Sequence, residues 1–319
     1  MMDPHLLPPT TAFQRVRRVL RFPLLRLVWT LLLLDLVRWG LFHLAPGLAR
    51  AENVSLAGAL RNALLLSFVL WASVYLFEGK TLAEAVGLKA STALGGFSRG
   101  FLIGAGLLTL VTFSLWVCGA YHVLGLGAGT SPWGWGQLAV IFLCVAVFEE
   151  VLARGIVFRL LEQGLGTWAA LVLSALLFGF MHFANPGATT RSAVALAVEA
   201  GVLLAAAYVA TRSLWLPIGL HTAWNIFEGP VYGARVSGIP LPSLLEVRFS
   251  GPEWLTGGAF GPEAGLPAVL LGGALGLAFL LLAVRRGQIF TPRWLGRLLP
   301  KSRRTPEPRP SGQVAQPLL

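Results

Sequence analysis

The chain has 319 residues, of which 55% are hydrophobic and only 12% are charged. Soluble domains carry roughly 25% charged residues, and a soluble fold of this size cannot bury so much apolar side chain. The mean hydropathy of +0.72 therefore excludes a water-soluble globule, and the composition also excludes a disordered, collagen-like or coiled-coil chain. The amino-acid sequence predicts an integral membrane protein.

The positive charge is concentrated at the two ends of the chain. Lys and Arg number 25 against 14 Asp and Glu, which gives a net charge of +11. Basic clusters that flank apolar segments are typical of topology signals and of contacts with anionic lipids. Because no nucleic-acid motif accompanies them, we do not expect nucleic-acid binding. The two cysteines, Cys118 and Cys144, are too few for a disulfide framework or a thiolate metal site.

Eight apolar segments have the length, or nearly the length, that a membrane-spanning helix requires. They run over residues 22–45, 57–77, 99–120, 137–159, 168–184, 192–211, 214–228 and 266–284. Basic residues favour the cytoplasmic side, so the arginine-rich flanks predict that both termini are cytoplasmic. We therefore predict an all-α fold, a polytopic membrane bundle of about eight transmembrane helices.

The sequence divides into three regions. Residues 1–21 are predicted to form a basic cytoplasmic segment, and residues 22–284 the transmembrane bundle with a long outer loop at 229–265. Residues 285–319 form a basic, proline-rich cytoplasmic tail that we expect to be disordered.

Polar side chains within the apolar segments mark candidate functional sites, because an ionisable group is costly at membrane depth. They are Glu149, Glu150 and Arg154 in the fourth segment, His182 at the end of the fifth, Glu199 in the sixth, and His221 and Asn225 in the seventh. At the helical rise per residue, Glu149 and the two histidines fall at a similar middle depth. This match indicates a water-filled cavity with hydrolytic chemistry, whereas Glu199 is explained as well by helix packing or cavity lining.

Helix geometry gives the two adjacent glutamates different roles, since their side chains project about 100° apart. Glu150 precedes Arg154 by four residues, the favoured order for an intrahelical ion pair. Glu149 is left without a local cation and is a candidate general base toward water. The alternative is that both acids pair with Arg154 in the bundle core. His221 and Asn225 are also four residues apart, so imidazole and amide can converge on one substrate atom.

Three motifs occur in a fixed order, each on a predicted helix. EExxxR corresponds to Glu149, Glu150 and Arg154, FxxxH to Phe178 and His182, and HxxxN to His221 and Asn225. In these motifs, within a core of about residues 80–228, the chain resembles the CPBP family of intramembrane proteases. This family is also called the Abi or CAAX-protease type-2 family and is related to the prenyl-protein endopeptidase. The resemblance implies that Glu149 and His182 activate water and that His221 and Asn225 stabilise the oxyanion.

The need for a metal ion stays open at this point. Glu149, His182 and His221 suffice in number for a catalytic zinc that keeps one open position. The chain has no HExxH motif, which would place two zinc ligands on one helix. The same three groups can also activate water without a metal. We favour metal-free water activation slightly, keep zinc as the alternative, and expect no organic cofactor.

The expected function is that of an intramembrane endopeptidase acting on a membrane-associated substrate, either a prenylated CAAX-type protein or a precursor peptide. Two alternatives come from other classes. A non-catalytic immunity or scaffold protein of the same fold is disfavoured by the complete set of motif residues. A proton-coupled transporter is disfavoured because the sequence shows no internal repeat.

Overall fold

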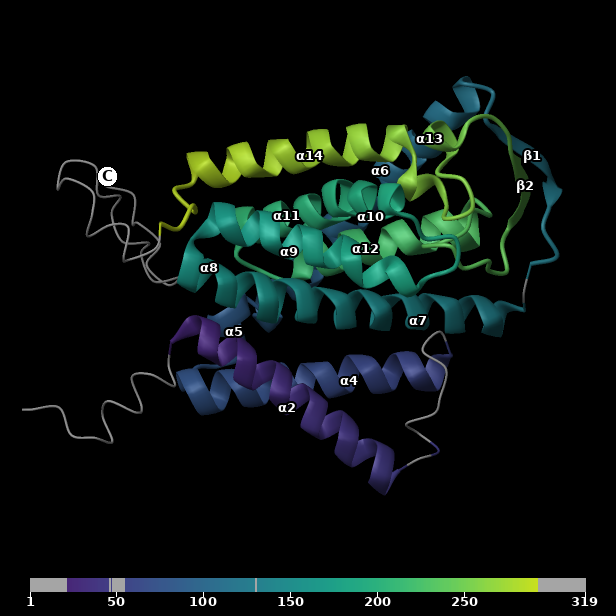
Figure 1. The fold of residues 1–319 in the computed structure, drawn as a ribbon. Helices are drawn as coiled ribbons and strands as arrows, with labels where there is room; N and C mark the ends of the chain where they lie inside the picture. The colour runs from purple at the N-terminus through teal and green to yellow at the C-terminus, as the bar shows by residue number, and fades with distance from the viewer. Residues whose placement is uncertain (1–21, 46, 48–54, 130, 292–319) are drawn as a thin grey trace, which may run out of the picture.

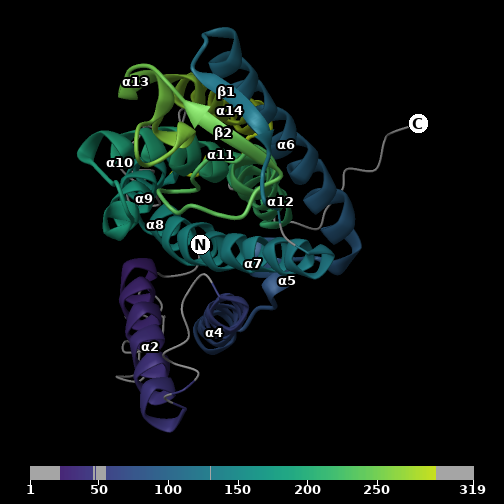
Figure 2. The same cartoon turned by 90° about the vertical axis from the view of Figure 1, so that its right-hand side faces the viewer.

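The computed structural model describes residues 22–45, 47, 55–129 and 131–291, which form a bundle of helices (Figures 1 and 2). The predictions made for residues 1–21 and for the tail from residue 292 onward lie outside the described residues. Helix α7 lies between α2 and α4 on one side and α6, α9, α12 and α14 on the other (Figure 2).

The helices follow one another with several changes of helical type. In chain order they are α2 (Pro23–Leu44), α4 (Leu56–Ser73), η2 (Val74–Glu78), α5 (Leu82–Val86), η3 (Ala90–Thr92), α6 (Ala93–Val117), α7 (Pro132–Glu150), η4 (Val151–Phe158), α8 (Arg159–Leu165), α9 (Thr167–Met181), η5 (His182–Ala184), α10 (Thr190–Leu196), η6 (Ala197–Val202), α11 (Leu203–Thr211), α12 (Trp215–Ile226), η7 (Phe227–Val231), α13 (Glu253–Thr256), η8 (Pro262–Ala264) and α14 (Leu266–Arg285). The π-helical stretches η2, η4, η6 and η7 each continue a preceding α-helix.

Six helical stretches of the described chain are long and apolar enough to cross a membrane. They are Pro23–Leu44, Leu56–Glu78, Ala90–Val117, Thr167–Ala184, Thr190–Thr211 and Leu266–Arg285. The predicted all-α polytopic bundle is therefore confirmed, whereas the count of eight stays a prediction.

The two remaining predicted spans, 137–159 and 214–228, are helical but do not belong to this set of six. The first carries the charged residues of the EExxxR motif, and the second is short. Both helices turn polar side chains into the bundle.

The described chain begins and ends at the same end of the helix bundle. The Pro23 end of α2 and the Arg285 end of α14 lie at the same end of the bundle (Figure 1). Which side of the membrane this end faces stays a prediction.

Buried ion pairs stabilise this end. Glu78 binds Arg26 at 3.0 Å and Arg159 at 2.6 Å, and Glu162 binds Arg212 at 2.5 Å. The Glu78 pairs link α2 and η2 to α8, and the Glu162 pair links α8 to the end of α11. Arg26, Glu78 and Arg159 are each more than nine-tenths buried, so these side chains belong to the interior of the bundle.

Glycines allow α6 and α12 to approach closely. A side chain at Gly100 would place its Cβ 2.0 Å from the carbonyl oxygen of Leu216, and one at Gly219 would place its Cβ 2.1 Å from that of Phe97. Small residues at such contacts are how membrane helices pack closely. The contact holds α12, which carries His221 and Asn225, in the core of the bundle.

The outer loop 229–265 folds back onto the bundle. Two strands that the sequence analysis did not predict, β1 (Tyr121–Leu126) and β2 (Leu245–Phe249), pair antiparallel. The hydroxyl of Tyr121 donates a hydrogen bond to the carbonyl of Tyr232 at 2.9 Å. The loop also contains α13 and η8, so it is an ordered cap at the end of the bundle that lies away from both described chain ends (Figure 1).

Candidate active site

The polar motif residues meet at one cavity of about 990 Å³. Glu149, His182, Glu199, His221 and Asn225 all line it, from α7, η5, η6 and α12. Glu150 and Arg154 are buried behind the wall. The structure therefore brings together all the site residues predicted from the sequence and separates them into a cavity-lining group and a buried pair.

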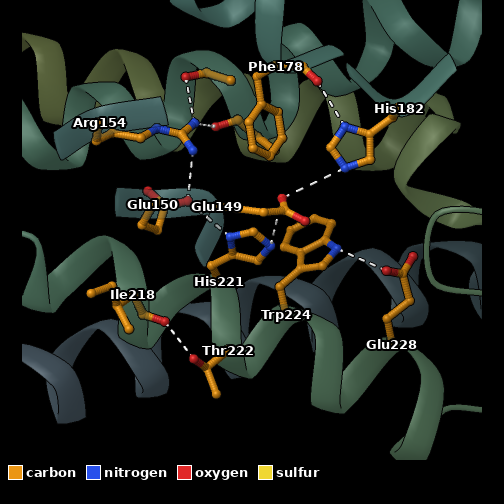
Figure 3. Close-up of polar contacts among 12 residues, drawn as sticks. Glu149, Glu150, Arg154, Phe178, His182, Ile218, His221, Thr222, Trp224 and Glu228 are labelled. Atoms are coloured by element: carbon orange, nitrogen blue, oxygen red, sulfur yellow. Dashed lines mark hydrogen bonds and ion pairs between the residues drawn. The ribbon is translucent and has the colours of Figure 1, made fainter. Parts of the chain in front are cut away.

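The Glu149 carboxylate lies between the rings of His182 and His221 (Figure 3). Its Oε2 atom is 3.8 Å from Nε2 of His182 and 3.8 Å from Nε2 of His221. Both distances are too long for a direct hydrogen bond, and Oε2 is buried without a hydrogen-bond partner. A water oxygen about 2.8 Å from the carboxylate and from one of these nitrogens fits this spacing.

The other nitrogen of each ring is fixed by an acceptor. Nδ1 of His182 lies 2.8 Å from the carbonyl oxygen of Phe178, and Nδ1 of His221 lies 3.0 Å from Oε1 of Glu150. A carbonyl or carboxylate oxygen only accepts, so both Nδ1 atoms carry a proton. The Nε2 atom of each ring is thereby left to act on the cavity, which is how an outer partner orients a functional histidine.

Glu150 and Arg154 form a buried ion pair with an Nη1 to Oε1 distance of 2.7 Å. Nη2 of Arg154 also donates to the carbonyl oxygens of Ala200 at 2.9 Å and Gly201 at 3.1 Å, and the guanidinium lies over the Phe178 ring. Arg154 thus links η4 to η6 and α9. The sequence predicted the pair with Glu150 but not the contact between Glu150 and His221, because that contact joins residues 71 positions apart.

Departures from α-helical geometry occur where the polar residues lie. Helix α7 becomes the π-helical η4 directly after Glu150, Glu199 lies within η6, and α12 becomes η7 two residues after Asn225. Such π-helical turns occur frequently at functional sites. In η6 the carbonyl groups of Ala200 and Gly201 accept hydrogen bonds from Arg154. The spacing of the sequence motifs gave no sign of these turns.

The structure also tests whether the site residues fit a zinc ion. Within the described ranges, no group of three or more His, Cys, Asp or Glu side chains is arranged to hold a metal ion. Glu149 faces both imidazoles, but the three side chains as placed do not form such a set. The thiol of Cys144 is buried in α7 and that of Cys118 is exposed, and both are free.

Three further carboxyls lie at the loop side of the cavity. Glu199 and Glu263 line it, and Glu228 is buried beside them, where it accepts a hydrogen bond from Nε1 of Trp224 at 3.1 Å. Burial raises the pKa of Glu263, against the opposite effects of Ser237 and His182. The sequence leaves the role of Glu199 open between helix packing and cavity lining, and it does not single out Glu228 or Glu263 as site residues. Glu228 ends a predicted span, and nothing in the loop sequence indicates that Glu263 is buried.

The comparison with protein families agrees with this geometry. The model of the family described as type II CAAX prenyl endopeptidase Rce1-like matches residues 131–227, which contain all three motifs. None of the curated proteins compared with the chain matches it. The resemblance to the CPBP and CAAX-type proteases is thereby confirmed over residues 131–227, and this match supports a CAAX-type intramembrane protease in general.

Proposed function

We propose that this chain, which matches the type II CAAX prenyl endopeptidase Rce1-like family over residues 131–227, is an active intramembrane endopeptidase. It hydrolyses a membrane-associated peptide with water activated by Glu149 and His182. The observation that carries the proposal is the position of the Glu149 carboxylate, 3.8 Å from the Nε2 atom of each histidine and inside the cavity. The substrate class is a prenylated CAAX-type protein or a precursor peptide held at the membrane.

The first step is the attack of water on the scissile carbonyl carbon. Glu149 takes a proton from the water while Nε2 of His182 accepts the second hydrogen bond and aims the oxygen. Positioned proton transfer of this kind contributes roughly 10²–10⁴-fold in rate. His182 can take this role because its Nδ1 proton is held by the Phe178 carbonyl.

The second element is the stabilisation of the tetrahedral oxyanion. Asn225 offers an amide N–H, and His221 offers an N–H from Nε2 when its ring is protonated on both nitrogens. The Glu150 carboxylate, 3.0 Å from Nδ1 of His221, balances that positive charge. Donors aimed at a developing oxyanion are each worth roughly 3–4 kcal/mol of the barrier.

The final step is the breakage of the peptide C–N bond. The protonated Glu149 donates its proton to the leaving amine as the C–N bond breaks, which releases a carboxylic acid and an amine. A proton then passes from the acid to the amine, so the final products are a carboxylate and an ammonium group. The net reaction consumes one water molecule and needs no electron transfer. Glu149 returns to its starting state, so the chain's own groups complete the cycle.

The test is cleavage by the purified full chain in phosphatidylcholine vesicles. A library of farnesylated and unmodified lipid-anchored peptides is incubated with wild-type protein and with Glu149→Gln, and the products are identified by mass spectrometry. We expect defined fragments with the wild type and none with the variant. The absence of wild-type cleavage across the library, or equal cleavage by the variant, would instead support a non-catalytic protein of the same fold.

A further inference from the structure

The loop side of the cavity contains three buried carboxyls that the mechanism does not use. Glu199, Glu228 and Glu263 are each at most 3% exposed. They come from η6, η7 and η8, so the sixth predicted span, the seventh and the outer loop all contribute. Glu263 interacts electrostatically with both Glu199 and Glu228.

These carboxyls lack cationic partners within the described part of the chain, where no ion pair is formed by any of the three. Arg154 influences Glu199 electrostatically, but its guanidinium hydrogen-bonds to Glu150 and to two carbonyls. His182 influences Glu263, but its ring lies between Phe178 and Glu149.

One oxygen of each carboxyl is buried without a hydrogen-bond partner. These atoms are Oε2 of Glu199, Oε1 of Glu228 and Oε1 of Glu263. Burial disfavours the charged form of such a carboxyl, and a cation that forms hydrogen bonds with these oxygens offsets that cost. Glu199 and Glu263 line the same cavity as Glu149, so a ligand that reaches Glu149 can reach them as well.

The outer loop closes this part of the cavity. Val236, Ser237 and Ile239 contribute to the lining beside Glu263. The backbone N–H of Gly238 donates to the carbonyl of Phe260 at 2.5 Å, and a side chain at Gly238 would place its Cβ 1.8 Å from the carbonyl oxygen of Pro186. The loop is therefore packed against the turn after His182, and this packing holds Glu263 next to the catalytic groups.

The chemistry of the ligand follows from charge and size. No set of described His, Cys, Asp or Glu side chains is arranged to hold a metal ion, which disfavours an inorganic cation. A cavity of about 990 Å³ is at the upper end for a small-molecule site and has room for an extended peptide. A lysine ammonium on its flexible stem, or an arginine guanidinium, can reach carboxyls beside the peptide path.

We propose that Glu199 and Glu263, with Glu228 behind them, form an anionic subsite that binds a lysine or arginine side chain of the peptide substrate close to the scissile bond. This inference rests on the proposed peptidase function. An acidic subsite at the loop side of the cavity orients a substrate that carries a basic residue at one fixed position.

The first experiment measures binding without requiring cleavage. Purified full chain in detergent is titrated with n-butylammonium and n-butylguanidinium, with n-butanol as the neutral control and with NaCl and MgCl₂ as inorganic controls, and the midpoint of thermal unfolding is recorded. We expect the two organic cations to raise the midpoint of the wild type. Glu199→Gln and Glu263→Gln should each need roughly tenfold more ligand, since a tenfold change corresponds to about 1.4 kcal/mol. The exposed Glu253→Gln should behave as wild type.

The second experiment measures cleavage in phosphatidylcholine vesicles, whose headgroup lacks a primary ammonium. Lipid-anchored peptides carry lysine, arginine, norleucine or glutamate at one position at a time. We expect a roughly 10- to 100-fold higher kcat/KM for lysine or arginine at one position, which corresponds to one or two factors of 1.4 kcal/mol. This ratio should fall toward one, through KM, in Glu199→Gln and in Glu263→Gln.

The outcomes separate the two proposals. Equal stabilisation by n-butanol or by the inorganic salts, or organic-cation binding that both glutamine variants retain, would overturn the anionic subsite. A library that is cleaved without any preference for a basic residue would overturn it as well.

Cation binding that depends on Glu199 and Glu263 in a protein that cleaves no peptide would support the cation site but contradict the peptidase function. The two variants lie on different elements, so misfolding of one leaves the other informative.

Discussion

The balanced cluster of Glu150, Arg154 and His221 differs from the acidic cluster of Glu199, Glu228 and Glu263 in whether a cationic partner lies within the chain. Glu150 has Arg154 at 2.7 Å and His221 at 3.0 Å. Glu199, Glu228 and Glu263 form no ion pair within the described residues. One oxygen of each, like Oε2 of Glu150, is buried without a hydrogen-bond partner, so the difference between the groups is the cation. Glu150 has its cationic partner within the chain, whereas the anionic subsite proposed above receives a cation from a ligand. The difference separates residues that hold the site from residues that recognise what enters it.

The largest expected effect is the loss of the cation from the balanced cluster. Arg154→Met leaves Glu150 buried beside only His221 and removes the hydrogen bonds to Ala200 and Gly201. Removing one partner of a buried pair costs about 3–5 kcal/mol of unfolding free energy, so the thermal midpoint should fall strongly. The matched control is Arg191→Met in the exposed pair with Glu253, for which the expected cost is below about 1 kcal/mol. Equal stability of Arg154→Met and Arg191→Met would contradict the structural role of the pair.

The second largest expected effect is on the cleavage rate, when Asn225 is replaced. Asn225 lies on the same helix face as His221 and lines the cavity. As an oxyanion donor it acts on the transition state, so Asn225→Ala should lower kcat and kcat/KM alike, by about 10²–10³-fold. Steady-state kinetics on one cleaved peptide measures both constants. An increase in KM alone would assign Asn225 to substrate positioning.

A smaller effect on stability is expected when one glutamate of each cluster is replaced by glutamine. Glu228→Gln removes a carboxyl that has no cationic partner among the described residues and retains an acceptor for Trp224, so its stability should stay within about 1 kcal/mol of the wild type. Glu150→Gln leaves Arg154 without its carboxylate and should lower stability by several times that amount. Thermal unfolding of the two variants side by side gives the comparison. A destabilisation of Glu228→Gln that matches Glu150→Gln would show that the acidic cluster is also needed for folding.

The smallest expected effect is that of metal removal. In the proposed mechanism Glu149 and His182 activate water without a metal ion, so exhaustive chelation should leave the cleavage rate unchanged. Elemental analysis of the active protein should then find no stoichiometric zinc. Stoichiometric zinc whose removal and return switch activity off and on would restore the zinc alternative.

The balanced cluster could be predicted from the sequence because its key contacts are local. The i,i+4 spacing places Arg154 next to Glu150 and leaves Glu149 apart, and the structure shows this arrangement. The convergence of His182 and His221 on Glu149 followed from depth in the membrane. The Glu150 contact with His221 was missed, because helix periodicity carries no information about which helices are neighbours.

The acidic cluster could not be predicted for a related reason. Glu263 lies in a polar loop, where a glutamate is ordinarily solvated, and it reaches the cavity only because the loop folds back over the bundle. The strands β1 and β2 that accompany this folding pair residues more than 100 positions apart, such as Tyr121 with Phe249. Short segments without clear alternation give little strand signal.

The central claim is that Glu149 acts on water while its neighbour Glu150 holds the site. The most direct test is the single-turnover cleavage rate of Glu149→Gln at saturating protein in vesicles, measured together with the dissociation constant of the same peptide. We expect the rate to fall by about 10²–10⁴-fold while the dissociation constant and the thermal midpoint stay close to those of the wild type. A single-turnover rate within a factor of about ten of the wild type, well short of a general base's usual contribution, would contradict the assignment of Glu149 as the general base.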